Sequence, residues 1–291
     1  MGYECLSTEG NSTVSLGSTI VQAAIRHQNR ILYSALDKIG FARSVLGSLP
    51  RNIAFRKDNP TFAVPPLSLL WDAQSYTDYF KYKTSGEEAA TLYWQLIKRY
   101  MPQNVGKPPR VCEWGCGPGR IIRHLPVLGN AHCEYYGTDY NHASIEWCAR
   151  SIRGVTFQTN RLAPPLAFPD GFFDVLFCRS VFTHLSEQMH YAWIRELSRV
   201  VKPAGVFMIS TQGFAHRERL LEDEKRRFDQ GELVVRHLAA EGKLNFSAFH
   251  HPQFVRDRLL QGFAILEHQE GRGTQDLWIV KNTAPPTNSR A

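Results

Sequence analysis

The segment VCEWGCGPGRII (111–122) constrains the fold more than any other part of the 291-residue chain. It combines a short apolar strand ending in an acid, a loop with Gly115, Gly117 and Gly119 at alternate positions, and the start of a helix. Glycine lets a backbone adopt positive φ and approach a ligand closely, and the free N–H groups of a helix N-terminus attract an anionic group. The segment therefore predicts one strand–loop–helix unit of a parallel sheet, with the loop placed to hold a ligand.

The next expected strand favours a nucleoside ligand. It covers 133–138 (CEYYGT) and is followed by Asp139, twenty residues past Gly119. An acid at the end of the second strand can accept hydrogen bonds from both hydroxyls of a ribose. The dinucleotide-binding pattern needs glycine where this chain has Arg120, and no Gly-Lys-Ser/Thr follows as in a phosphate-binding loop. These departures disfavour a pyrophosphate ligand and argue against a kinase or an ATPase.

Short apolar segments alternate with helical ones through the middle of the chain. Strands are expected at 110–114, 133–138, 155–158, 174–178 and 205–211, and helices at 118–126, 141–151 and 187–201. Alternation of this kind is typical of a parallel α/β sheet. A charged helix at 216–228 and an irregular stretch follow, and the strands 263–269 and 275–281 then enclose a tight turn, which predicts an antiparallel edge.

The region before the sheet is expected to be helical. Residues 20–39 place apolar side chains at helical spacing, which predicts an amphipathic helix. It would pack on its own domain or on a dimer partner, and contact with a membrane surface is the less favoured alternative. Glycines and prolines then predict an irregular connector over 40–66, and a second helix is expected at 85–101, opened by a capping box of Ser85 and Glu88.

Charge and cysteine content narrow the function classes. The net charge is +7, and residues 1–110 hold 13 basic and 8 acidic residues, whereas the remainder is nearly balanced. No RNA-binding module precedes the α/β region, so nucleic acid is disfavoured as a partner. The six cysteines form no CxxC pair, so we expect no metal site. The sequence has neither a signal-peptide pattern nor the run of ~18 apolar residues that a transmembrane helix needs, which favours the cytoplasm.

Taken together, these motifs resemble the class I S-adenosylmethionine-dependent methyltransferases over about residues 85–281. The matching segments are 111–122, Asp139, 160–187 (NRLAPPLAFPDGFFDVLFCRSVFTHLSE) and 196–211 (ELSRVVKPAGVFMIST). The resemblance implies a Rossmann-like, doubly wound seven-stranded α/β sheet with an antiparallel edge strand, and S-adenosylmethionine as the methyl donor. The expected divisions are an N-terminal helical extension at 1–84 with a lid drawn from 60–84, the methyltransferase domain at 85–281 with an acceptor-site insertion at 212–262, and a flexible tail at 282–291.

The resemblance also implies which residues hold the donor. Glu113 and the glycine loop would hold the methionine portion, Asp139 the ribose, and Asn160 with the neighbouring backbone the adenine. Tyr140 would cover the donor, and Arg179 either binds an acidic group in the site or pairs with a surface carboxylate. The complete donor set is Glu113, Gly115, Cys116, Gly117, Gly119, Asp139, Tyr140, Asn160, Arg161, Leu162 and Arg179.

The implied chemistry asks for a base and a dry pocket. Methyl transfer is an in-line displacement that aligns donor and acceptor at ~3 to 3.5 Å, and a neutral acceptor must also lose a proton, for which histidine is the natural base near pH 7. The candidates are His184, His250 and His251; the alternatives are a structural hydrogen bond for the first and a helix cap for the pair. We expect an enzyme of the EC 2.1.1 type that methylates an oxygen or nitrogen of a small molecule or sugar-like metabolite. A donor-binding regulatory or scaffold subunit and a nucleic-acid methyltransferase are the alternatives.

Overall fold

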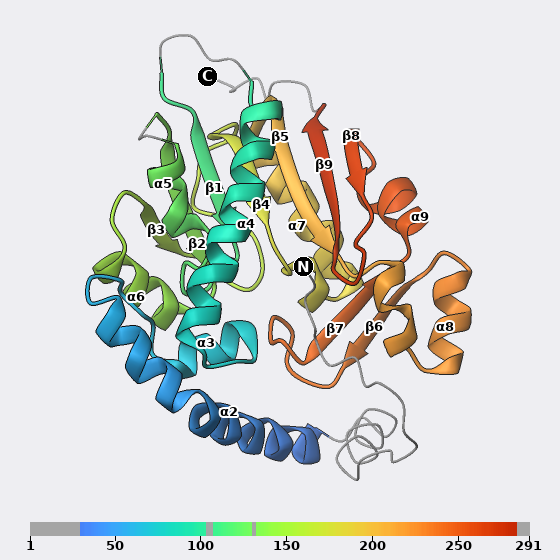
Figure 1. The fold of residues 1–291 in the computed structure, drawn as a ribbon. Helices are drawn as coiled ribbons and strands as arrows, with labels where there is room; N and C mark the ends of the chain where they lie inside the picture. Colours follow the sequence, from blue (N-terminus) through green and yellow to red (C-terminus); the bar gives the residue numbers. More distant parts are fainter. Residues whose placement is uncertain (1–29, 103–106, 130–131, 284–291) are drawn as a thin grey trace.

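The computed structural model describes residues 30–102, 107–129 and 132–283 and has a seven-stranded sheet at its centre (Figure 1). The strands follow the order β3-β2-β1-β4-β5-β9-β8. They are β1 (Arg110–Trp114), β2 (Glu134–Asp139), β3 (Thr156–Thr159), β4 (Phe173–Cys178), β5 (Val201–Thr211), β8 (Phe263–Gln269) and β9 (Asp276–Asn282). Strands β1 to β5 are parallel, and β9 runs antiparallel to both β5 and β8. The predicted Rossmann-like, doubly wound sheet with an antiparallel edge is confirmed.

Helices cover both faces of this sheet. Every residue of β4 is buried, as expected for a parallel strand with helices on its two sides. One face packs against α7 (Glu187–Val200) through Trp193 and Leu197, and the other packs against α4 (Tyr79–Tyr100) through Tyr93 and Ile97. The helix α6 (His142–Ser151) connects β2 to β3. Because the faces are filled, the loops at the carboxyl ends of the strands are where a site can form.

The helix α4 begins earlier than the sequence predicts. It starts at Tyr79, and Asp78 caps it by accepting a hydrogen bond from the Lys81 N–H (3.0 Å). Ser85 lies inside the helix, where its hydroxyl donates to the Lys81 carbonyl oxygen (2.6 Å). The predicted capping box of Ser85 and Glu88 is therefore wrong, because an aspartate seven residues earlier already satisfies the first turn.

The single helix predicted at 118–126 is also wrong. A 3-10 turn, η1 (Ile122–His124), leads into the short helix α5 (Leu125–Leu128). Pro126 lacks the N–H group that a continuous helix would need at this position, so the chain changes its hydrogen-bond pattern there.

One long helix, α2 (Arg30–Asp58), runs through the region where the sequence predicts an irregular connector. Gly40 and Pro50 both lie inside it, so the predicted break is wrong. Contacts with the segment before α4 hold the helix: Asn52 Nδ2 donates to the Thr77 carbonyl oxygen (2.7 Å), and Asn52 Oδ1 accepts from the first N–H of α4 (2.9 Å). These tertiary contacts outweigh the weak local helix propensity of glycine and proline.

The part of the chain between β5 and β8 is more regular than predicted. A 3-10 helix, η3 (Phe214–Arg219), and α8 (Glu222–Asp229) replace the single helix predicted at 216–228. The strands β6 (Leu233–His237) and β7 (Phe246–His250) form an antiparallel pair where the sequence predicts an irregular stretch, because their connection, 238–245, carries no short turn signal. A short helix, α9 (Pro252–Phe254), and a π-helical turn, η4 (Val255–Leu259), lead to β8. In Figure 1 the strand pair β6–β7 and the helix α3 (Leu67–Gln74) lie below the sheet.

Three predictions fall partly outside the described residues: the extension at 1–84 and the helix expected at 20–39, both up to residue 29, and the tail beyond Thr283. Within the described ranges, no helix is both long enough and apolar enough to cross a bilayer.

Candidate functional site

A cavity of ≈ 350 Å³ lies where the loops after β1, β2, β4 and β5 meet. Its walls come from the glycine loop, from the residues that follow β2 and β4, from α3 and from the connection between β6 and β7. The volume lies within the range of ~300 to 1,000 Å³ that is usual for small-molecule sites. The position, at the carboxyl ends of parallel strands, is the one at which α/β sheets bind ligands.

The glycine loop turns sharply after β1. Positive φ angles occur at Gly115 (+74°), Gly117 (+50°) and Gly119 (+70°). The N–H groups of Gly115 and Cys116 donate to the Thr138 carbonyl oxygen (2.7 and 3.1 Å), which fixes the loop to the end of β2. A Cβ at Gly115 would lie 2.2 Å from Val181 Cγ2, so this position admits only glycine without rearrangement.

Glu113 is a buried carboxyl group at the end of β1. Its Oε2 accepts a hydrogen bond from the Ile122 N–H (2.8 Å), and the residue is 3% exposed. Burial raises the pKa of Glu113 to about 8, against the opposing effects of the Arg120 guanidinium and the Ile122 hydrogen bond. A carboxyl group with this pKa is mostly protonated at pH 7, and a cation bound in the cavity would favour its ionised form.

Asp139 ends β2 and joins two loops. Its Oδ2 accepts from the Gly117 N–H and its Oδ1 accepts from the Asn141 N–H, each at 2.8 Å. Burial raises the pKa of Asp139, while the two backbone hydrogen bonds act to lower it. Each carboxylate oxygen can accept a second hydrogen bond, so a ligand in the cavity could still donate to this side chain.

Three further hydrogen bonds involve Asn160 and Tyr140, two residues of the predicted donor set. Thr138 Oγ1 donates to Asn160 Oδ1 (2.6 Å), and Asn160 Nδ2 donates to the Arg161 carbonyl oxygen (2.6 Å). The hydroxyl of Tyr140 donates to the Gly242 carbonyl oxygen (2.9 Å), which connects the loop after β2 with the β6–β7 connection.

The structure brings most of the predicted donor set to one cavity. The lining includes Glu113, Gly115, Cys116, Gly117, Asp139, Tyr140, Asn160, Leu162 and Arg179. Gly119 and Arg161 are outside the lining. Gly119 faces α6 instead, where an added Cβ would lie 2.5 Å from Ile152 Cδ1.

Arg120 and Arg179 both line the cavity. Arg120 is 9% exposed, and its Nη1 donates to the Ser85 carbonyl oxygen (3.0 Å), while its buried Nε has no hydrogen-bond partner among the described residues. Arg179 forms no ion pair with a carboxylate of the described ranges, and Asp170, one candidate partner, pairs with Arg199 (2.7 Å). Guanidinium groups in such a place suit the binding of a carboxylate.

Of the three predicted bases, only His184 lines the cavity. Its Nδ1 lies 2.7 Å from the Phe246 carbonyl oxygen, and because a carbonyl oxygen only accepts, Nδ1 carries the proton and Nε2 keeps a lone pair. Burial lowers the pKa of His184, so the ring is neutral at pH 7. A neutral imidazole with a free lone pair can accept a proton.

The other two candidates are outside the lining. His250 is fully buried, its Nε2 lies 2.8 Å from the Nε2 of His190, and burial lowers the pKa of His250 well below its usual value. His251 caps α9, because its Nδ1 accepts from the Gln253 N–H (3.2 Å), and its ring contacts Phe228 with centroids 5.3 Å apart. The structure thus shows the helix-cap alternative for His251.

The sequence alone does not single out His216 and Arg219, which line the cavity from η3. Burial lowers the pKa of His216 to about 4, and its buried Nδ1 has no hydrogen-bond partner among the residues that the structure describes. Arg219 Nη1 donates to Gln212 Oε1 (3.2 Å). Their position just after the carboxyl end of β5 is a sequence signal for a site residue. The prediction of one continuous helix at 216–228 assigns both residues to that helix instead.

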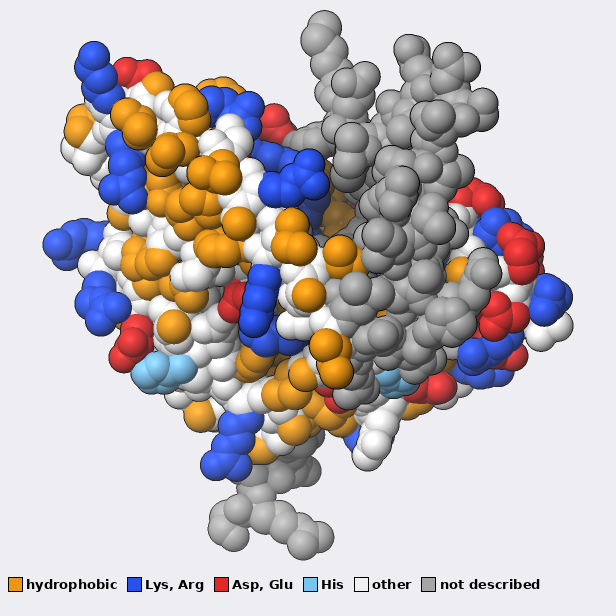
Figure 2. All heavy atoms as spheres, turned by 90° about the horizontal axis from the view of Figure 1, so that it is seen from below, with side chains coloured by type: hydrophobic (Ala, Val, Ile, Leu, Met, Phe, Trp, Pro, Cys, Tyr) orange, Lys and Arg blue, Asp and Glu red, His pale blue; other side chains and the backbone are white. Residues whose placement is uncertain are grey.

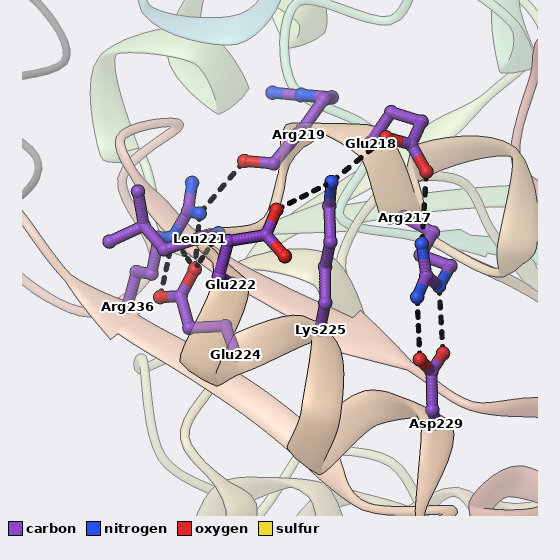
Figure 3. Close-up of polar contacts among 9 residues, drawn as sticks. All are labelled: Arg217, Glu218, Arg219, Leu221, Glu222, Glu224, Lys225, Asp229 and Arg236. Atoms are coloured by element: carbon purple, nitrogen blue, oxygen red, sulfur yellow. Dashed lines mark hydrogen bonds and ion pairs between the residues drawn. The ribbon is translucent and has the colours of Figure 1, made fainter.

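An ion-pair network holds η3 and α8 in place (Figure 3). Arg236 of β6 donates to the Glu224 carboxylate (2.8 Å from Nε to Oε1) and to the Arg219 carbonyl oxygen (2.8 Å). Arg217 binds both carboxylate oxygens of Asp229 (2.7 and 2.5 Å). The side chains of Arg236 and Glu224 are only 10% and 14% exposed, and Figure 3 shows the side chain of Arg219 extending away from the network. The network therefore fixes the backbone that carries both η3 residues of the cavity.

Comparisons with known proteins find similarity over part of the chain. Residues 112–209 match the family model described as a methyltransferase domain. A probable S-adenosylmethionine-dependent methyltransferase of Mycolicibacterium smegmatis is 31% identical to this chain over 101 residues. These residues are 35% of this chain and 37% of the relative, so the match spans little more than a third of that protein's length. Two solved structures are similar at 17% identity and a TM-score of 0.49: a Pyrococcus horikoshii protein (69% of this chain, 95% of that one) and an S-adenosylmethionine dependent methyltransferase of Mesorhizobium loti (65% and 97%).

Proposed function

We propose that this chain, whose residues 112–209 match the family model of a methyltransferase domain, transfers the methyl group of S-adenosylmethionine to an oxygen or nitrogen of a small molecule. The observation that carries the proposal is the cavity in which the glycine loop meets two buried acids, one at the end of β1 and one at the end of β2. All three features belong to the matched residues. Whole-chain activity goes beyond that match and is our inference.

The residues around the cavity fit a donor that combines a nucleoside with an amino acid. All of Asp139, Asn160 and Tyr140 line the cavity, where Asp139 can accept from the ribose hydroxyls and the other two would border the adenine. Glu113 would hold the ammonium group, and the unpartnered Nε of Arg120 would donate to the carboxylate. A cation beside Glu113 lowers the pKa of that carboxyl, so binding of the donor near pH 7 would release a proton.

When bound, S-adenosylmethionine supplies a methyl group activated by a positively charged sulfur. The protein then has to position the acceptor, hold it against that methyl group and keep water out. We assign the water exclusion to α3, whose last residues line the cavity, as part of the lid expected at 60–84. The insertion at 212–262 supplies further parts of the wall through η3 and the β6–β7 connection.

His184 is the base in this proposal. It is neutral, it lines the cavity, and its Nε2 is free to take the proton that the acceptor loses. His250 and His251 are left out of the role because neither lines the cavity. Arg179 and Arg219 give the acceptor side a positive character, which favours an acceptor that carries an acidic group.

Incubation of the full chain with S-adenosylmethionine and a pool of small metabolites tests the proposal, with products followed by mass spectrometry. We expect one or more small molecules to gain a methyl group, and His184→Ala to lower the rate by ~10² to 10⁴. His251→Ala is the matched control and should keep its activity. Donor binding without any methylated product would support a regulatory or scaffold subunit instead, and methylation confined to added nucleic acid would support the other alternative.

A further inference from the structure

The outer side of α2 carries an apolar stripe. Its members recur at spacings of three or four residues: Ile31, Ala35, Ile39, Ala42, Leu46, Leu49 and Ile53. At 3.6 residues per turn they fall within an arc of about 80°. All seven are exposed. The exposed fractions of the larger side chains are 85% for Ile31, 55% for Ile39, 71% for Leu46, 48% for Leu49 and 63% for Ile53. The stripe is therefore an apolar surface open to solvent.

This stripe is separate from the face with which α2 packs on the protein. The buried residues of the helix are Ser48, Asn52 and Phe55. They lie about 130° around the helix axis from the stripe and contact the segment before α4. The packing of α2 on its own domain uses only the buried face and does not account for the exposed apolar stripe. An exposed apolar surface of this size is typical of an interaction site.

Positive charge accompanies the stripe. The sequence of α2 contains six basic and two acidic residues. Exposed cations stand on both sides of the stripe, at Lys38, Arg43, Arg56 and Lys57. One of the two acids, Asp37, is partly buried, and its Oδ2 accepts from Trp71 Nε1 (3.4 Å). Figure 2, a view from below, shows hydrophobic side chains spread over this face with Lys and Arg side chains among them.

We propose that this face of α2 docks the protein on a membrane surface that contains anionic lipid. The stripe is about 33 Å long at 1.5 Å per residue, and it can lie in the plane of the interface with its flanking cations at the headgroups. The charge of this face favours anionic lipid over a second copy of the chain. A second copy would bring the same cations against one another, whereas anionic headgroups neutralise them. Docking of this kind places α2 on the bilayer and not across it.

The helix that carries the stripe also borders the candidate site through its opposite side. A second cavity of ≈ 310 Å³ is lined by Ser34 and Asp37 of α2, by Trp71 of α3 and by part of the β6–β7 connection. It shares four lining residues with the first cavity: Asp72, Ser75, Lys243 and Leu244. A bilayer on the stripe would therefore be separated by α2 from a cavity that borders the candidate site.

Cosedimentation of the full chain with lipid vesicles tests the docking. We expect binding to vesicles made of equal parts phosphatidylcholine and phosphatidylglycerol at low salt, and affinity at least about tenfold lower for phosphatidylcholine alone or at high salt. The double variant Ile39→Glu/Leu46→Glu and the charge variant Lys38→Glu/Lys57→Glu should each lose at least about tenfold in affinity. The control Val127→Glu, at an 80% exposed apolar position of α5, should bind as the wild type does.

Donor titration and circular dichroism show whether each variant is folded, so this test is independent of methyl transfer. If the apolar variant does not fold, the charge variant decides, and undiminished affinity in that variant overturns the proposal. Absence of binding by the wild type at low salt also overturns it. A stable dimer that Leu46→Glu dissociates, in a chain that does not bind vesicles, would assign the stripe to a second copy.

Discussion

Replacement of Gly115 by alanine tests the geometry of the glycine loop. Gly115 has φ +74°, a region that costs an L residue roughly 1–2 kcal/mol. The new Cβ would also lie 2.2 Å from Val181 Cγ2, and since a β-branched side chain is stiff at χ1, this overpacking costs roughly another 1–3 kcal/mol. We therefore expect Gly115→Ala to lower the free energy of unfolding by about 2–5 kcal/mol and to weaken donor binding.

Gly47→Ala is the matched control. Gly47 lies inside α2, and no atom lies within 4 Å of the position that its Cβ would take. Alanine removes the helix penalty of glycine, so this variant should gain about 0.5–1 kcal/mol. Urea unfolding followed by tryptophan fluorescence measures both variants. A Gly115→Ala protein that unfolds at the wild-type midpoint, or a Gly47→Ala protein that loses as much stability, would refute the loop geometry.

Three further predictions concern single side chains. Burial raises the pKa of Glu113 from 4.5, the ordinary value of this side chain, to about 8. The contribution of the protonated side chain to stability is therefore full below pH 4.5 and is lost as the pH rises through about 8. Urea unfolding should show Glu113→Gln more stable than the wild type near pH ~9 but not near pH ~4. Arg236→Met leaves the mostly buried Glu224 without its ion-pair partner and should lower the free energy of unfolding by roughly 2–4 kcal/mol. The control is Arg217→Met, on the more exposed side of the same network, and an equal loss in that variant would contradict this account. His251→Ala removes the cap of α9, so thermal unfolding should show a loss of about 1 kcal/mol with no change in donor affinity.

Local patterns predict the strands of the seven-stranded sheet well, although they miss β6 and β7. The segments 110–114 and 263–269 have the predicted bounds, and the other sheet strands differ mainly at their ends. Each is a short apolar run, and an apolar run between helical segments has few other structures open to it. Asp139 is likewise predictable, because the carboxyl ends of parallel strands meet at one edge of the sheet.

The remaining features depend on contacts between residues far apart in the sequence. Gly40 and Pro50 read as helix breakers, yet Asn52 and the residues before α4 hold α2 together across them. His184 follows β4 and His250 ends β7, so both lie near the end of a strand. Only His184 lines the cavity, whereas His250 is buried against His190. Neither outcome has a local sequence signal, because each is decided by which distant side chain lies alongside.

Isothermal titration of S-adenosylmethionine, and separately of S-adenosylhomocysteine, into the full chain tests the central claim most directly. We expect saturable binding at one site per chain, with a proton released near pH 7 as Glu113 ionises. Asp139→Ala should weaken the binding at least about tenfold, the loss that one charge-assisted hydrogen bond of about 1.5–3 kcal/mol accounts for. A folded wild-type chain that binds neither ligand would contradict the account.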